Sequence, residues 1–159
     1  WNVLMTAPVP VSSVYFGNLA IILKITLFTQ IWIGILYLIT GKLVGFSGFP
    51  PFEILIWLLR GTLAAIAIGA LQLLLSMIIR SFSVPIGIAL LGSIVGFLFS
   101  NKGLGYFCPY ALMLMGMNSN KTEDSLQGGV LPFLLSTVVF FLLFSGCSIY
   151  ILKKRDVRA

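Results

Sequence analysis

The chain contains 159 residues, of which 59% are apolar and only 9% are charged, and its mean hydropathy is +1.10. A soluble domain carries about 45–50% apolar and about 25% charged residues, and one this small could not bury so much apolar surface. The composition therefore predicts an integral membrane protein and excludes intrinsic disorder. The net charge of +6 does not indicate nucleic-acid binding. Most basic residues lie at the ends of apolar runs, where membrane topology and lipid headgroups account for them.

The residue types exclude several kinds of chemistry. The chain has no His and only two Cys, which removes His-based triads, His general bases, and the usual zinc and haem sites. Lys42 follows a glycine but lacks the glycine spacing and the Ser or Thr of a phosphate-binding loop. We therefore expect no cofactor, no metal and no catalytic residue in this chain, and no disulfide between Cys108 and Cys147.

Four apolar runs are long enough, or nearly long enough, to cross a bilayer. A helix needs about 20 residues to span the hydrocarbon core, and in lipid such runs must be helical because their backbone groups cannot stay unpaired. The sequence predicts an all-α, polytopic membrane helix bundle in a single domain over residues 1–159. The expected spans are residues 19–39, 54–79, 84–99 and 130–152.

The connections between the runs predict an orientation. Residues 1–17, the short turn 80–83 and the tail 153–159 lie on one side and carry five basic residues against one acid. The other side, including the long loop 101–129, carries three basic residues and three acids. The positive-inside rule therefore places the first side in the cytoplasm. Because the chain begins with Trp1 rather than Met, we expect it to start inside a longer protein.

A stripe of small and polar residues follows the second run. Small residues at four-residue spacing let two helices approach closely in lipid. Such a stripe serves as a subunit interface, as the wall of a substrate pathway or as packing within the chain, and the sequence does not decide among these. Its members are Gly61, Ala65, Gly69, Gln72 and Ser76.

A second set of polar residues is expected to face protein or water rather than lipid. Thr26, Gln30 and Tyr37 share one face of the first span. A transport path and plain hydrogen bonding between helices explain that face equally well. Arg60 shares a helix face with Glu53, and it is either a contact for a charged substrate or an anchor at the membrane boundary.

The segment Tyr106–Met117 is apolar and rich in Met, which adapts to varied apolar partners. In one interpretation, the segment is a short helix that lies in the outer interface. In a second, it is a re-entrant element that contacts an amphipathic ligand. A third treats it as a lid packed on the ends of the spans.

Three stretches together resemble one family of membrane proteins. They are Trp1–Gly17, with its Ala7-Pro8-Val9 turn, the hairpin Leu71–Gly87, and the ending Leu152-Lys153-Lys154-Arg155-Asp156-Val157. In order and spacing they are similar to the membrane subunits of type-2 ABC exporters, most of all the permeases of lantibiotic immunity and related peptide-antibiotic resistance. That membrane domain has six spans, so the resemblance implies that two spans precede this chain.

The resemblance implies a partner set and a function. Two permease subunits, identical or different, would pair in the bacterial cytoplasmic membrane above ATP-binding subunits that hold ATP and Mg²⁺. They would expel an amphipathic peptide antibiotic or a lipid-like cargo. A short helix after Pro10 would contact the ATPase, with coupling residues Pro8, Pro10, Val11, Val14 and Tyr15 and with Tyr15 docked in a groove of the partner. The alternatives are a non-transporting assembly or regulatory subunit and an ion-coupled carrier.

Overall fold

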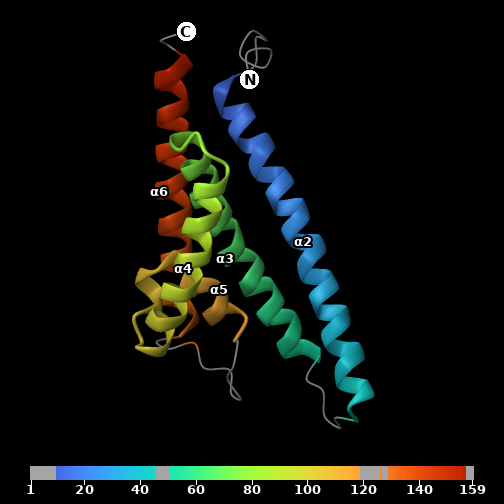
Figure 1. Ribbon diagram of the computed structural model, residues 1–159. Helices are drawn as coiled ribbons and strands as arrows, with labels where there is room; N and C mark the ends of the chain where they lie inside the picture. The colour runs from blue at the N-terminus through green and yellow to red at the C-terminus, as the bar shows by residue number, and fades with distance from the viewer. Residues whose placement is uncertain (1–9, 46–50, 119–125, 127–128, 157–159) are drawn as a thin grey trace.

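The computed structural model describes residues 10–45, 51–118, 126 and 129–156, and every regular element among them is helical. The elements are α2 (Val11–Leu43), α3 (Pro51–Ile78), α4 (Ser83–Asn101), the 3₁₀ turn η1 (Gly105–Phe107), α5 (Pro109–Gly116) and α6 (Val130–Asp156). Figure 1 shows α2, α3 and α6 as long rods, with α5 near the end of the bundle opposite the two termini. The predicted all-α bundle is thus confirmed.

Four of these helices are long and apolar enough to cross a membrane, so the chain is a multi-pass membrane protein. They agree with the four expected spans. The helices α2 and α4 extend past both predicted ends, whereas α3 begins earlier than predicted and α6 ends later. The candidate spans run over Ser12–Leu43, Phe52–Ile78, Ser83–Asn101 and Val130–Lys154. With 33 residues, α2 is about 50 Å long, longer than the hydrocarbon core, so it must tilt or project from the membrane.

The start of α2 differs from the prediction in one respect. The helix begins directly after Pro10, as expected, but it continues without a break into the first span. Residues 11–17 are therefore the first turns of α2 and not a separate short helix. Gly17, the weakest helix former in this stretch, does not interrupt the helix.

The sequence predicted that Tyr15 contacts a partner protein, but in the structure this residue lies inside the chain. Its side chain is 0% exposed and shares a 2.8 Å hydrogen bond with the Ser145 hydroxyl of α6. It also packs in a core cluster with Leu19, Ala70 and Leu152. Tyr15 thus fastens the first turns of α2 to α3 and α6. Pro10 is exposed and Val14 is half-buried, whereas Pro8 and the side chain of Val11 lie outside the described residues.

The centre of the bundle is α3, which packs against α2, α5 and α6 and lies between α2 and α6 in Figure 1. Two core clusters follow its length. The first joins α3 to the start of α2 and the end of α6, and the second joins Ala64 of α3 to Leu112 of α5 and Phe133 of α6. Because α3 takes part in both clusters, it joins α2, α5 and α6 into one bundle.

The residues of the predicted stripe face two different helices, α2 and α5. A side chain added at Gly69 would meet Ile22 of α2, and one added at Gly61 would meet Gln30 of α2 as well as Met117. Ala65 is half-buried, whereas Gln72 turns to α5 and Ser76 is exposed, its hydroxyl donating to the Leu73 carbonyl. The glycine part of the stripe therefore serves the α2–α3 contact inside this chain.

The chain crosses the bundle in alternating directions. Figure 1 places the two described ends at one end of the molecule, and the turn between α3 and α4 lies toward that end, whereas the α4–α5 connection lies at the other. This arrangement agrees with the predicted grouping of the N-terminal segment, residues 80–83 and the tail on one side.

This topology predicts the accessibility of two exposed lysines. In a Cys108→Ala, Cys147→Ala background, a cysteine replacing Lys153 should be labelled by a membrane-impermeant maleimide only after the cell is opened. A cysteine replacing Lys102 should be labelled in intact cells, because the two sites end helices on opposite sides of the bundle. Labelling of both sites in intact cells would contradict the topology.

The glycine contact on α3 gives a second prediction. In Gly69→Leu, the new Cβ would lie 2.8 Å from the Ile22 Cγ2 atom, so the free energy of unfolding should fall by about 1–3 kcal/mol. The measurement is thermal unfolding of the purified protein in detergent. The control is Gly146→Leu on α6, where no atom outside its own helix lies within 4 Å. Equal stability of the two variants would show that Gly69 does not face α2.

Candidate functional site

The most unusual element of the bundle is the short helix α5, which is enclosed by longer helices. Pro109 occupies the first helical position, where its missing amide costs no hydrogen bond. Ala111 and Leu112 are fully buried, and α5 contacts α3, α4, α6 and η1. The segment predicted as an interfacial helix, a re-entrant element or a lid is thus packed among the spans.

Glycines in the neighbouring helices let α5 approach this closely. A Cβ at Gly96 of α4 would lie 2.8 Å from the backbone nitrogen of Ala111, and a side chain at Gly92 would overlap the ring of Tyr110. A Cβ at Gly116 of α5 would lie 3.1 Å from the backbone carbon of Arg60 on α3. Backbone and ring atoms give way less easily than a flexible chain end, so a side chain at Gly92 or Gly96 would force α5 to shift, and one at Gly116 would be tight.

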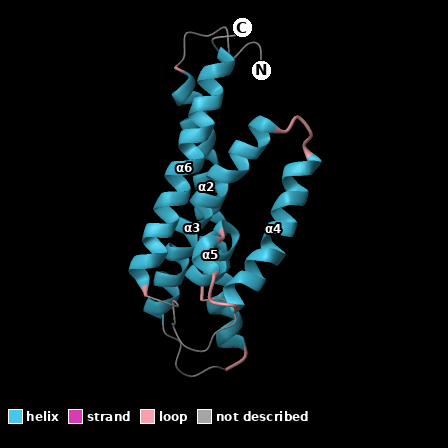
Figure 2. Cartoon of the chain, turned by 90° about the vertical axis from the view of Figure 1, so that its left-hand side faces the viewer, coloured by secondary structure: helices cyan, strands magenta, loops and turns pink. Residues whose placement is uncertain are grey.

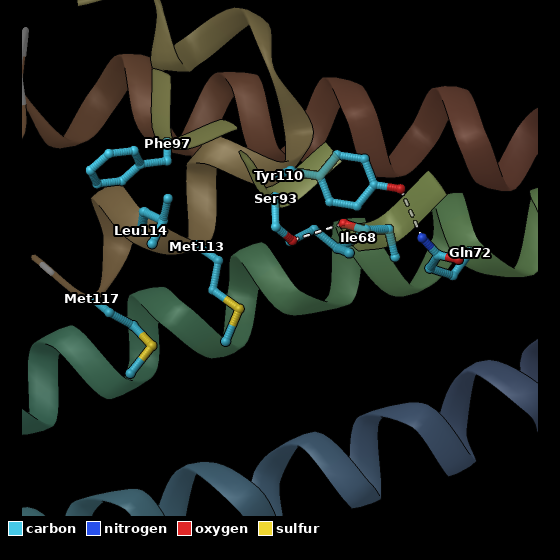
Figure 3. Close-up of a pocket in the computed structure, with 9 residues that line it drawn as sticks. Ile68, Gln72, Ser93, Phe97, Tyr110, Met113, Leu114 and Met117 are labelled. Atoms are coloured by element: carbon cyan, nitrogen blue, oxygen red, sulfur yellow. Dashed lines mark hydrogen bonds between the residues drawn. The ribbon is translucent and has the colours of Figure 1, made fainter. Parts of the chain in front are cut away.

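A cavity of about 380 Å³ lies between α3, α4 and α5. Figure 3 shows side chains from all three helices around it. The lining residues are Ile68, Gln72, Ala89, Ser93, Phe97, Tyr110, Met113, Leu114 and Met117. None of them is charged, and six of the nine have purely apolar or thioether side chains.

The polar groups of the cavity are few and neutral. Gln72 donates from Nε2 to the Tyr110 phenol oxygen at 2.7 Å, and the Ser93 hydroxyl donates to the Ala89 carbonyl of its own helix at 2.8 Å. Figure 3 draws both bonds. Because Tyr110 acts as the acceptor toward Gln72, its hydroxyl hydrogen can still be donated to a third group. The cavity thus offers one directed pair of amide and phenol within an apolar lining.

The predicted substrate-path residues do not line this cavity. Gln30 is 3% exposed and donates from Nε2 to the Met117 sulfur at 3.7 Å, while its Oε1 is buried and has no partner among the described residues. Thr26 and Arg60 are half-buried, and Tyr37 is exposed. Met117 both lines the cavity and accepts the hydrogen bond from Gln30.

Sequence reasoning missed the contribution of α4 to this site. Ala89, Ser93 and Phe97 recur every four residues and form one wall. A signal was present in the sequence, because Gly92 and Gly96 repeat at the same spacing that marked the glycines of α3. The partner of that second glycine pair is α5, which the sequence could not place. Within the described ranges, no group of three or more Cys, Asp or Glu could hold a metal ion.

Comparison of the chain with known protein families, with curated proteins and with solved structures finds no match. The function is therefore argued from the cavity and from the pattern of the sequence.

The hydrogen bond between Gln72 and Tyr110 predicts a measurable coupling energy. Gln72→Ala and Tyr110→Phe each remove the hydrogen bond, so a double-mutant cycle on thermal or denaturant unfolding in detergent should give a coupling of about 0.6 kcal/mol. A control cycle combines Gln72→Ala with Tyr150→Phe, because Tyr150 is exposed on α6, and its effects should add. Additive effects in the first cycle would contradict the observed pairing.

Proposed function

We propose that this chain is a permease subunit of an ABC exporter, and that it moves an amphipathic peptide or a lipid-like molecule out of the bacterial cytoplasmic membrane. The observation that carries the proposal is the uncharged cavity between α3, α4 and α5. A site for an amphipathic molecule needs mostly apolar walls and a few placed polar groups, and the cavity has both. The order of the sequence motifs supports the choice of an ATP-driven exporter.

The packing of α4 suggests how such a permease would work. α4 packs mainly on α5 and much less on α3, so a movement of α5 would carry α4 with it and change the width of the cavity. Binding and hydrolysis of ATP on a partner subunit would drive that movement. The chain itself would supply the walls of the pathway and would not hold the nucleotide.

The buried Tyr15 changes how coupling to the ATPase is proposed to occur. The first turns of α2 present Pro10 and Phe16 as exposed groups, and Tyr15 bonds to Ser145 of α6. A force on the exposed residues would thus reach α3 and α6 through Tyr15. In this proposal, Phe16 takes the place of Tyr15 as the aromatic contact for the ATPase, beside the residues predicted from the sequence, Pro8, Pro10, Val11 and Val14.

The lining argues against an ion-coupled carrier. Such carriers place an acidic or His group deep in the membrane, whereas the nine lining residues include neither. If the chain were a non-transporting assembly or regulatory subunit, the cavity would have no role.

The test expresses the protein together with any ATP-binding subunit that a neighbouring gene encodes. We expect the two to co-purify, and cells that make both to grow at higher concentrations of an amphipathic peptide antibiotic. Phe16→Asp should weaken co-purification, because it would bury an unpaired charge at the contact. The control Phe107→Asp lies in η1, near the opposite end, and its exposed ring does not line the cavity between α3, α4 and α5.

Three outcomes would contradict this proposal. Absence of any ATP-binding partner would exclude an ABC exporter. Co-purification without a gain in resistance or in export would identify a regulatory or assembly subunit instead. Equal co-purification of Phe16→Asp and the wild-type chain, with the permease present in the membrane, would exclude the coupling surface.

A further inference from the structure

The cavity lies at the depth of the hydrocarbon core. Gly92 and Ser93 are at the middle of α4, which runs from Ser83 to Asn101. Gln72 lies about two turns before α3 ends at Ile78, on the side of the molecule that carries the termini. A molecule in the cavity would thus be surrounded by apolar helices, and its polar group would meet Gln72 and Tyr110.

The volume limits what can occupy the cavity. About 380 Å³ is near the lower end of the range for small-molecule sites, about 300–1,000 Å³. A folded peptide is far larger, whereas this volume is of the size that a single hydrocarbon chain would need. The thioethers of Met113 and Met117 adapt to a flexible chain, and they contribute two of the lining side chains.

The lining also limits the charge of the occupant. An ionised group buried here would lack a counter-ion among the nine lining residues, and burying an unpaired charge is strongly unfavourable. A hydroxyl, ester or amide, in contrast, can accept the phenol hydrogen of Tyr110, and a hydroxyl or amide can also donate to the Gln72 side-chain oxygen. The polar pair therefore favours an uncharged polar group.

The surroundings point to the membrane as the source of the occupant. On α4, the side chains of Leu90, Leu91 and Ile94 are exposed and apolar, as expected of a helix face in contact with lipid. Figure 2 shows α4 leaning away from α2 and α6 toward the end that carries the termini. A hydrocarbon chain can thus reach the space beside α4 without leaving the apolar phase.

We propose that the cavity between α3, α4 and α5 binds the acyl chain of an uncharged amphiphile from the membrane, with its polar group hydrogen-bonded to Gln72 and Tyr110. This inference deepens the proposed function and rests on it for the role of the amphiphile as cargo. Binding itself does not depend on the ATPase, so the two proposals can fail separately.

The test is photo-crosslinking of the purified full-length permease in phosphatidylcholine nanodiscs without ATP. The probe is a monoacylglycerol whose acyl chain carries a diazirine, and a second probe is the fatty acid with the same chain and a charged carboxylate. We expect saturable labelling of Phe97, Met113, Leu114 or Met117 by the first probe. Unlabelled monoacylglycerol should compete for it, and the carboxylate should label these residues about tenfold less.

Variants separate the cavity from the general lipid surface. Ser93→Trp should fill the cavity and reduce the labelling about tenfold, a free-energy change of about 1.4 kcal/mol. Its control, Leu91→Trp, lies on the opposite side of α4 and should label as the wild type does. Tyr110→Phe keeps the ring against Gly92 and should weaken binding of the monoacylglycerol about fivefold, which corresponds to the loss of one neutral hydrogen bond.

Each other result overturns part of the inference. Non-saturable labelling that Ser93→Trp and Tyr110→Phe leave unchanged would exclude the cavity as the site. If Ser93→Trp does not fold, labelling of Tyr110→Phe alone still tests this point. Equal or stronger labelling by the carboxylate probe would exclude an uncharged headgroup. If the cavity is labelled but the chain binds no ATPase, the lipid site stands and the proposal of an ABC exporter is wrong.

Discussion

The structure depends on the contact between the backbone of α5 and the glycines that receive it. Gly96 brings the backbone of α4 against Ala111, and Gly116 brings α5 against the backbone of Arg60 on α3. In lipid, where apolar side chains gain little by leaving their surroundings, such close backbone approach is a main source of helix association. Larger residues at these two positions would push α5 out from between the spans.

This insertion explains both the cavity and the unequal packing of the helices. α5 fills the space between α3 and α4 only near one end, so the two spans stay apart beyond it and the cavity of about 380 Å³ remains. Tyr110 closes one side of that space through its bond to Gln72. Meanwhile α2, α3 and α6 form a second unit joined by the Tyr15 cluster. Movement between these two parts is the simplest way in which the site could open.

The sequence predicted the spans well and the contacts poorly, for a physical reason. Long apolar runs must become helices in lipid, so the existence and the number of the spans followed from their length and composition. A helix that is apolar on all sides, however, carries no pattern to show which face meets protein. For this reason the sequence could not show that Tyr15, which the resemblance placed at a partner, packs inside the chain, or that Ser93 belongs to a cavity wall. Gln72 was recognised as a contact residue, but its partner in α5 depends on tertiary structure.

The most direct test of this account is amide hydrogen exchange across Ala111–Gly116 in lipid nanodiscs, measured by mass spectrometry. An isolated helix of this length is marginal in water, so α5 is protected only if the spans enclose it. The account predicts exchange as slow as that of α4, and fast exchange of the same segment in Gly96→Leu. Rapid exchange in the wild-type chain would show that α5 lies at the surface of the membrane, and it would contradict both the enclosed helix and the cavity beside it.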